Sequence, residues 1–514
     1  MVNEDLEIVE FGGNEISVAD LVSILDSKKG VRLSQSTTWK NKINSGAEFL
    51  EKYWKDEGVI YGVTTGYGDS CTVGISPELI EELPLHLTRF HGCGLGNYFS
   101  AAIGRGILAT RLSSLSQGFS GVRLELLERL ELLINENIIP VIPEEGSVGA
   151  SGDLTPLSYV AATIVGERQV YHKGEIRETA EVYKELNITP LKLKPKEGLA
   201  LMNGTSVMTA LACQAYSRAE YLVKIASRIT AMSVEVLMGN KDHFLPELFA
   251  VKKHKGQNQV AAWIYADLHD QKKREEKRLQ DRYSIRCAPH VIGVLNDALP
   301  WMKEQIETEL NSANDNPIIL AEEKRILHGG HFYGGHIAFI MDSMKNAIAN
   351  IADLLDRQMA LMMDQNTNNK LPKNLSGAQG ERSAINHGLK ALQISVSAWT
   401  AEALKLTMPA SVFSRSTECH NQDKVSMGTI AARDCLRILQ LTEQVVAALL
   451  ISVCQGINIR IRQNDFDKKQ LKAGVVDIVD SISDISAFVD EDRPLDKDLR
   501  VIIQRLQDQY WSIC

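Results

Sequence analysis

The chain has few of the residues that interrupt helices or favour sheets. Of its 514 residues only 14 are proline, and aromatic residues make up 6%. A core built from aliphatic side chains with so little proline favours helix over sheet. Hydrophobic residues at 44% and charged residues at 24% are typical of a globular protein, which argues against intrinsic disorder. The length predicts two or three structural regions.

An excess of positive charge is also missing. Lys and Arg number 56 against 65 Asp and Glu, a net charge of −9, which excludes a general electrostatic affinity for nucleic acid or an anionic membrane. The one basic run, residues 272–278, has no interleaved aromatics and is interpreted as a solvated segment. The most apolar stretch, residues 445–454, is shorter than the roughly 20 residues that a membrane span needs. No basic and apolar leader is visible at the N-terminus.

The cysteines do not form a framework. Eight are scattered along the chain without a CxxC pair, and Cys435 and Cys454 lie in apolar surroundings. Such cysteines are most simply buried free thiols. A reduced, cytoplasmic protein is therefore expected.

Several common catalytic motifs are absent, including GxxxxGK[ST] and HExxH. The loose GxGxG of residues 91–96 has no preceding strand pattern and no acidic partner, so it predicts a tight loop joining helices. His328, His331 and His336 crowd a glycine-rich stretch, but carboxylate or cysteine support for a metal is missing. We expect a loop that presents polar groups, and no metal.

Hydrophobic periodicity divides the chain. Residues 1–215 mix short segments with many glycines, as loops that carry function often do. A helical rhythm of three to four residues follows from about 216, again over 337–363, and in a third long helix over about 425–459. Helices apolar on several faces are buried on several sides. The predicted regions are 1–215, a helical bundle over 216–460, and closing helices over 461–514.

The segment from Glu145 to Ser158, EGSVGASGDLTPLS, carries unusual chemistry. Small residues flank Ser151, and Gly152 has no Cβ, so the Gly152 nitrogen can approach the Ala150 carbonyl carbon. Closing that bond with loss of two waters gives a five-membered ring with an exocyclic methylene from Ser151. Asp153 lies where it could start or cap a helix. On these residues alone, an ordinary Gly/Ser loop before a helix remains an alternative.

Seven segments, in order along the chain, resemble the signatures of the aromatic amino acid ammonia-lyases and aminomutases, the family of histidine, phenylalanine and tyrosine ammonia-lyases. One is the Ala150-Ser151-Gly152 segment itself. The others are Tyr61–Gly68 (YGVTTGYG), Gly198–Thr205 (GLALMNGT), Gln280–Cys287 (QDRYSIRC), Ser312–Pro317 (SANDNP), His328–Phe332 (HGGHF) and His420–Gly428 (HNQDKVSMG). The resemblance covers about residues 59–430. Thr64, Tyr67 and His331 depart from the usual Asn, Phe and Asn.

The resemblance implies a mainly α-helical fold of the fumarase/aspartase-like kind, a long-helix bundle with a loop-rich N-terminal region. It implies that Ala150, Ser151 and Gly152 form 4-methylideneimidazol-5-one (MIO), an electrophile made from the backbone. It also implies a homotetramer whose sites take residues from several chains. The small-molecule substrate would be an aromatic amino acid, with no nucleic acid or membrane partner.

The resemblance also assigns roles. Tyr61 resembles the catalytic acid or base, for which we expect a depressed phenol pKa. Arg286 resembles the residue that pairs with the substrate carboxylate, and Tyr283, three residues earlier, a second catalytic tyrosine. Asn203 and Gln280 are amides that could hold the MIO oxygens and the leaving ammonia.

The remaining resemblances concern the substrate ring. Phe332 resembles an aromatic residue that lines the site, and Phe90-His91 occupies the pair that contacts the ring. His91 disfavours pure phenylalanine selectivity, and Gln422, where histidine lyases tend to have Glu, disfavours histidine.

The prediction is therefore ammonia elimination from tyrosine to give p-coumarate, with phenylalanine possible. A histidine ammonia-lyase giving urocanate, a 2,3-aminomutase and an inactive family member acting as a binding protein are the alternatives.

Overall fold

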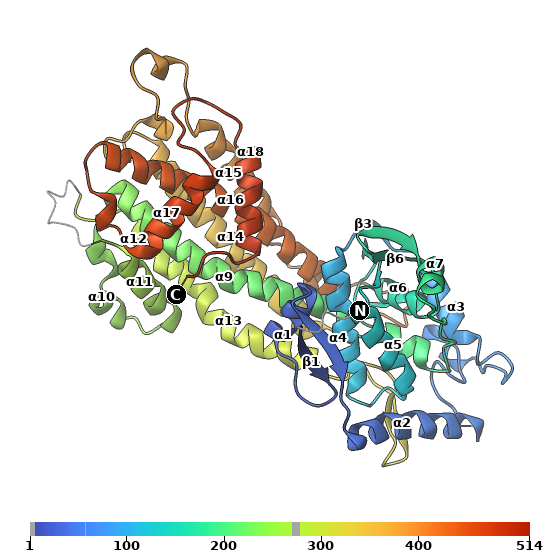
Figure 1. Cartoon of the computed structure of the whole chain (residues 1–514). Coiled ribbons are helices and arrows are strands. Elements are labelled where there is room, and N and C mark those ends of the chain that lie inside the picture. The colour runs from blue at the N-terminus through green and yellow to red at the C-terminus, as the bar shows by residue number, and fades with distance from the viewer. Residues whose placement is uncertain (1–5, 57, 270–277, 514) are drawn as a thin grey trace. The chain divides into compact units, whose positions relative to one another are not determined.

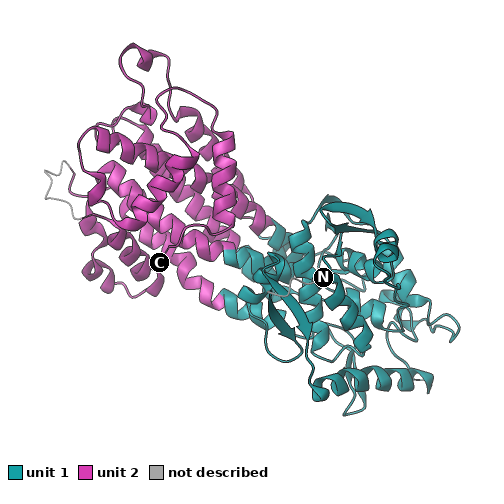
Figure 2. Ribbon diagram, in the orientation of Figure 1, with its two compact units in different colours: residues 1–217, 302–342, 409–433 teal, residues 218–301, 343–408, 434–514 magenta. Residues whose placement is uncertain are grey.

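The computed structural model describes residues 6–56, 58–269 and 278–513. Two compact units make up the chain (Figure 2). Unit 1 comprises residues 1–217, 302–342 and 409–433, and unit 2 comprises residues 218–301, 343–408 and 434–514. The basic run noted above lies outside the described residues except for Arg278.

The strands are short and, within the described residues, all belong to unit 1. β1 pairs with β2 in parallel, and the antiparallel groups are β3-β5, β4-β6-β7 and β8-β9. Their bounds are β1 Glu7–Phe11, β2 Lys29–Leu33, β3 Leu95–Tyr98, β4 Ile139–Pro140, β5 Pro143–Glu145, β6 Gln169–His172, β7 Glu175–Glu178, β8 Ile318–Leu320 and β9 Arg325–Leu327. The loose GxGxG therefore leads into strand β3, so the predicted loop between two helices is wrong.

In the part of unit 1 that the structure describes, eight helices lie wholly within the unit. They are α1 Val18–Leu25, α2 Thr37–Lys55, α3 Leu83–Phe90, α4 Ala101–Ser116, α5 Leu124–Asn135, α6 Leu154–Ile164, α7 Thr179–Glu185 and α8 Glu197–Met202. Serine caps begin several of them: Ser17 forms a capping box on α1, and the Ser100 side chain accepts a hydrogen bond from the Ile103 backbone N–H on α4. Helices α3, α6 and α8 contact one another, which positions the loops that follow α3 and α8 and the one that precedes α6.

Four long helices contribute residues to both units. They are α9 Ser206–Leu237, α13 Ala288–Leu310, α14 Gly335–Met363 and α16 Gly428–Arg462 (Figure 1). The prediction of a mainly helical fold is confirmed, with 59% of the chain in helix. Helices α14 and α16 match the predicted ranges 337–363 and 425–459 closely, whereas α9 begins about ten residues before the predicted start.

The described residues of unit 2 form helices and loops and contain no strand. Its own helices are α10 Pro246–Ala250, α11 Lys255–Asp267, α12 Tyr283–Arg286, α15 Lys390–Lys405, α17 Ala473–Ile485 and α18 Asp496–Gln507. The short 3₁₀ turns of the two units are η1 Gly68–Thr72, η2 Lys241–Phe244, η3 Lys373–Leu375, η4 Gly380–Ala384, η5 Ser411–Phe413 and η6 Lys468–Gln470. Helices α17 and α18 lie within residues 461–514, the range predicted to form closing helices.

Buried polar side chains join the long helices inside unit 2. The Arg460 Nε of α16 donates to the Val236 carbonyl of α9 at 2.9 Å. The Gln358 amide of α14 donates to the Thr230 hydroxyl of α9 at 3.0 Å. A Cβ on Gly456 would lie 2.6 Å from Val236, so a glycine lets α16 approach α9 closely. These contacts fix the register of the bundle.

Helix α16 is long and apolar enough to cross a membrane by length and composition, but 83% of its most apolar window is buried in the protein. That burial is the property of a core helix.

The predicted division into 1–215, 216–460 and 461–514 treats the chain as successive blocks and stays a prediction. The two units described above instead interleave distant segments.

Candidate active site

Tyr61 lies on a loop anchored by its neighbours. Ile60 and Val63 are fully buried in a cluster with Leu50 of α2 and Ile319 of β8. The Thr64 hydroxyl, at the position where the family signature has Asn, accepts a hydrogen bond from the Ile60 backbone N–H at 2.8 Å. The loop is therefore rigidly held on both sides of Tyr61.

The Tyr61 hydroxyl oxygen accepts a hydrogen bond from the Gly68 backbone N–H at 2.8 Å. Burial raises the pKa of Tyr61 above its ordinary value, the Gly68 N–H acts in the opposite direction, and the Glu418 carboxylate adds to the rise. The expected depressed pKa is therefore wrong for the chain as it folds alone. Tyr61 is a neutral phenol here, with one donor already aimed at the oxygen that would carry the charge of a phenolate.

Glu418 was not foreseen from the sequence. Its carboxylate accepts the Asp69 backbone N–H at 2.9 and 3.1 Å, and a Cβ on Gly68 would lie 2.4 Å from that carboxylate. Glu418, Cys419 and His420 are three successive non-glycine residues with positive φ, of 51°, 53° and 66°. Such backbone is uncommon and costs free energy, and it tends to occur at functional sites.

Glycine contacts fix the backbone of the triplet. Gly152 has φ of +73° and forms a parallel bridge with Gly204, and a Cβ on Gly152 would lie 2.0 Å from the Gly204 carbonyl oxygen. A Cβ on Gly149 would lie 2.2 Å from the Ser426 hydroxyl. Only glycine fits either position, so Ser151 is carried on a turn that is tight on both sides.

Asp153 caps a helix, though not the one that follows it in sequence. Its side chain makes no cap bond to α6; instead Oδ2 accepts the backbone N–H groups of Val207 and Met208, both at 3.0 Å, at the start of α9. Oδ1 accepts from Ser147 at 3.0 Å and from the Thr429 hydroxyl. Burial raises the pKa of this carboxyl group, and the four donors oppose that rise. Asp153 thus ties the triplet to α9.

Asn203 is buried beside the triplet. Its side-chain Oδ1 has no hydrogen-bond partner among the described residues, and its backbone carbonyl accepts from Arg111 Nη1 at 3.2 Å. Arg111 is fully buried, which lowers its pKa to about 10. A buried amide oxygen without a partner is costly unless a ligand or cofactor supplies a donor. Gly204, the neighbour of Asn203, donates its backbone N–H to the Ser151 carbonyl at 3.3 Å, and the predicted role of Asn203 stays a prediction.

Gln422 reaches the serine itself. Its Nε2 donates to the Ser151 hydroxyl at 3.4 Å, and its Oε1 accepts from the Thr417 hydroxyl at 3.0 Å. The amide is therefore oriented by Thr417 and lies at the carbon that would become the methylene. Phe90 and His91, at the end of α3, have ring centroids 4.3 Å apart, and Phe90 is 59% exposed.

The third group of predicted residues lies in unit 2. Arg286 and Tyr283 share the single turn of α12, and the guanidinium lies 4.5 Å from the tyrosine ring centroid, as their spacing predicts. Arg286 Nε also donates to the Asp281 carbonyl at 3.0 Å. Tyr283 is 72% exposed, and Gln280 is exposed as well. The chain thus orients the guanidinium through its Nε atom.

The glycine-rich histidine stretch supports the tyrosine loop. His328 Nε2 accepts the Tyr61 backbone N–H at 3.4 Å, and burial lowers the pKa of His328. Phe332 is half-buried in the turn that follows. Among the residues that the structure describes, no group of three or more His, Cys, Asp or Glu could hold a metal ion.

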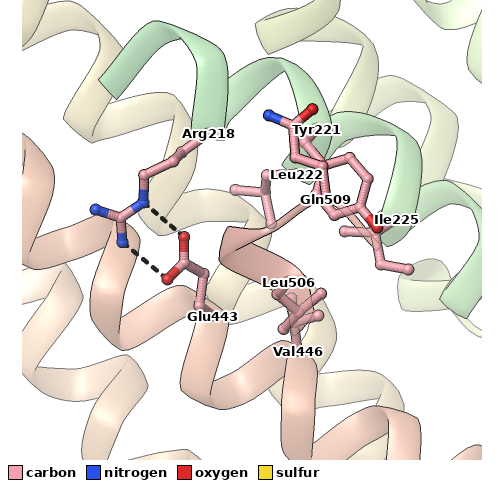
Figure 3. Close-up of a pocket in the computed structure, with 8 residues that line it drawn as sticks. All are labelled: Arg218, Tyr221, Leu222, Ile225, Glu443, Val446, Leu506 and Gln509. Atoms are coloured by element: carbon pink, nitrogen blue, oxygen red, sulfur yellow. Dashed lines mark hydrogen bonds and ion pairs between the residues drawn. The ribbon is translucent and has the colours of Figure 1, made fainter. Parts of the chain in front are cut away.

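A small cleft in unit 2 is a different kind of feature (Figure 3). Its walls are mostly apolar, and the Arg218 guanidinium is fully engaged there by Glu443 through two bonds of 2.8 Å. None of the site residues predicted from the sequence lines it. A satisfied ion pair in an apolar cleft explains the packing of α9 against α16 and offers no reactive group.

Comparisons with known proteins agree with this fold and this arrangement of segments. A sequence profile described as aromatic amino acid lyase matches residues 16–480. A helical protein with that match is an ammonia-lyase in class, a carbon–nitrogen lyase. The chain belongs to the aromatic amino acid lyase family.

Individual relatives differ in the substrate for which they are named. The chain is 36% identical to histidine ammonia-lyase of Halalkalibacterium halodurans, over 97% of this chain and 96% of that protein. Other curated relatives at 33–38% identity carry the same name. Tyrosine aminomutase from Streptomyces globisporus superposes with a TM-score of 0.90 at 32% identity, over 98% and 97% of the two chains. Histidine ammonia-lyase from Trypanosoma cruzi gives 0.87 at 29% identity, over 98% and 94%.

Proposed function

We propose that the protein eliminates ammonia from L-histidine to give urocanate. The observation that carries this proposal is the near full-length identity of 33–38% to proteins named histidine ammonia-lyase. It favours the histidine alternative over the tyrosine preference drawn from His91 and Gln422 together. The elimination removes the β-proton, breaks the bond between Cα and nitrogen, and leaves a carbon–carbon double bond and ammonia.

The residues fit an MIO group made from Ala150, Ser151 and Gly152. The triplet lies where a Cβ on Gly152 would collide with Gly204, and the Asn203 amide oxygen beside it has no partner among the described residues. Once formed, the group supplies an electrophile that turns the amine into a better leaving group. Asn203 and Gln422 then act as the amides that orient the reacting groups.

The remaining roles belong to side chains. Tyr61 takes the β-proton on its phenolate oxygen, and the Gly68 N–H stabilises the charge of that phenolate. Because burial raises the pKa of Tyr61, deprotonation of its phenol costs more free energy than it would in water. Arg286 of unit 2, oriented by Asp281 and Tyr283, would pair with the substrate carboxylate, and Gln280 and Tyr283 keep the roles that the family resemblance implies for them. Phe332 and the Phe90-His91 pair line the part of the site that takes the aromatic ring of the substrate.

A second candidate, elimination from L-tyrosine, is favoured by one observation. Position 422 carries an amide within reach of Ser151, whereas a carboxylate suits the imidazole of histidine. Because Phe90 adds an exposed apolar ring, phenylalanine would remain a slower substrate. Under this candidate, His91→Leu shifts kcat/KM from tyrosine towards phenylalanine.

The deciding experiment is turnover by the purified protein. Histidine, tyrosine and phenylalanine are supplied separately, and ammonia release and arylacrylate absorbance are followed. The proposal expects the highest kcat/KM with histidine. A higher value with tyrosine would establish the second candidate, and a β-amino acid product would identify an aminomutase.

Intact mass tests the cofactor separately. Wild type should be lighter than its encoded mass by two waters, and Ser151→Ala should carry no deficit. A wild-type chain at full mass would overturn the MIO assignment whatever the turnover. We further propose the homotetramer that the family resemblance implies and the cytoplasmic location expected from the scattered cysteines of the sequence. Size-exclusion chromatography with light scattering tests the former, and cell fractionation tests the latter.

A further inference from the structure

Arg168 combines a costly backbone with a well-placed side chain. It occupies the turn between α6 and β6 with φ of 62°, a conformation that non-glycine residues seldom adopt. An observed outlier of this kind is a reason to look for a function of the side chain that requires it.

The guanidinium joins α3 to α6. Nη2 donates to the Thr88 carbonyl in the last turn of α3 at 2.7 Å, and Nη1 donates to the Ser158 hydroxyl of α6 at 3.0 Å. The same group lies 4.2 Å from the ring centroid of Tyr159. A Cβ on Gly92 would lie 2.3 Å from Nη2, so the residue after His91 is small enough to admit the guanidinium. Arg168 therefore holds the end of α3 that carries the ring-contacting pair.

His91 is held in one protonation pattern by its own helix. Its Nδ1 lies 3.0 Å from the Leu87 carbonyl oxygen. Because a carbonyl can only accept, Nδ1 carries the hydrogen and Nε2 of the neutral ring carries the lone pair. Burial lowers the pKa of His91, the Leu87 carbonyl acts in the opposite direction, and the Arg168 charge adds to the lowering.

Among the charged and titratable groups around His91, Arg168 carries the charge that no neighbour largely cancels. Arg89 of α3 is paired with Glu167 through Nη2 and Oε1 at 2.6 Å, so these two largely cancel. Tyr159 and Cys93 also face the Arg168 guanidinium.

We propose that Arg168 is a positioning residue that keeps His91 as a hydrogen-bond acceptor towards the substrate ring, and so selects rings that carry a donor. Such a ring has an imidazole N–H or a phenol O–H, and a plain phenyl ring is disfavoured. The inference rests on the proposed function only in placing His91 at the substrate ring.

Three variants test it through a ratio. The quantity is kcat/KM for the better donor-bearing substrate, histidine or tyrosine, divided by kcat/KM for phenylalanine. Arg168→Gly suits the positive φ and should fold, and should lower the ratio about three- to tenfold, the usual value of one hydrogen bond. Arg168→Lys keeps the positive charge but lacks the two donor nitrogens of the planar guanidinium, so its ratio should lie between those of Arg168→Gly and wild type. The double variant Arg89→Gln/Glu167→Gln, which removes the neighbouring ion pair without leaving one charge behind, should leave the ratio unchanged.

The pH dependence separates this role from simple structural support. In Arg168→Gly the ratio, divided by the wild-type ratio at the same pH to cancel titration of the substrate, should fall further as the pH is lowered from 8 to 6, because protonation of His91 removes the acceptor. A ratio that is unchanged in Arg168→Gly, or equally lowered in Arg89→Gln/Glu167→Gln, overturns the proposal.

A measurement that does not depend on turnover distinguishes failure of the Arg168 proposal from failure of the proposed function. Nitrogen-15 spectra of ring-labelled histidine, with the His91 signal assigned from the spectrum of His91→Gln, should show hydrogen on Nδ1 in wild type and a higher His91 pKa in Arg168→Gly. An inactive protein with these spectra would overturn the lyase proposal alone. Hydrogen on Nε2, or an unmoved titration, would overturn the role of Arg168 even in an active enzyme.

Discussion

Removing the Asp153 side chain should destabilise unit 1 more than its small size suggests. In Asp153→Ala the backbone N–H groups of Val207 and Met208 lose their acceptor at the buried start of α9. Each unsatisfied buried donor costs about 1–3 kcal/mol, so the two together cost roughly 2–6 kcal/mol. Removal of a carboxylate whose burial is itself unfavourable offsets part of that cost, which places the expected loss at about 2–4 kcal/mol.

Asp153→Asn isolates the charge from the hydrogen bonds. The amide oxygen can still face the two N–H groups while its NH₂ faces the hydroxyls of Ser147 and Thr429, which can turn to accept. The expected loss is therefore below about 1.5 kcal/mol. Asp467→Ala is the matched control, because Asp467 also accepts a backbone N–H, from Lys469 at 2.9 Å, but at an exposed position.

The assay is urea unfolding followed by far-ultraviolet circular dichroism, at one protein concentration because any oligomer would make the midpoint depend on concentration. The midpoint should fall in the order Asp467→Ala, Asp153→Asn, Asp153→Ala, with the alanine at 153 clearly lowest. The same three proteins are weighed, since a displaced triplet should also lose the two-water deficit. Equal midpoints for Asp153→Ala and Asp467→Ala would refute the capping role.

Three further outcomes follow from the geometry. Tyr61→Phe should lower kcat about 10²–10⁴-fold, and because the Tyr61 pKa is raised, it should also abolish the rise in rate that wild type still shows at pH 10. The buried Tyr67 hydroxyl has no partner among the described residues, so Tyr67→Phe should match wild type, and equal effects of the two variants would make Tyr61 structural. Arg286→Lys should lower kcat/KM about 10–100-fold through lost charged hydrogen bonds, and an unchanged value would move the carboxylate site elsewhere. The bond to Arg382 is the main cause that lowers the pKa of Glu491 from 4.5 to about 2, so Glu491 contributes stability above pH 4.5 that is lost as the pH falls towards 2. In Glu491→Gln the unfolding midpoint should depend less on pH over that window, and an unaltered pH dependence would contradict the pairing.

The helices were the predictable part of the structure. Helices α14 and α16 are apolar on several faces, so a periodic pattern sustained over about 30 residues locates them well. The start of α9 was placed about ten residues late because Asn203-Gly204-Thr205 reads as a loop and gives no sign that Asp153, fifty residues earlier, caps the next turn. Capping across the fold leaves no local pattern.

The site was predictable in its residue types and less so in its electrostatics. The triplet and its amide neighbours follow from motifs, and the structure brings Ser151, Asn203 and Gln422 together. The pKa of Tyr61 was expected in the wrong direction, because burial of the loop by Ile60 and Val63 is a tertiary effect. Glu418 had no signal either, since its position depends on three successive residues in left-handed backbone.

The packing of Gly152, Gly204 and Arg111 has a consequence for how such a chain can vary. A Cβ on Gly152 would strike the Gly204 carbonyl, and one on Gly204 would lie 2.0 Å from Arg111 Nη1. The three positions form a stack in which any added atom displaces the next member, so in a saturation library alanine at 152 or 204 should be depleted as strongly as larger residues. Gly74, whose Cβ would meet nothing within 4 Å, should accept many side chains. Among homologous sequences, a change at 204 should be accompanied by a change at 111, which makes the stack a physical source of covariation between positions 93 residues apart.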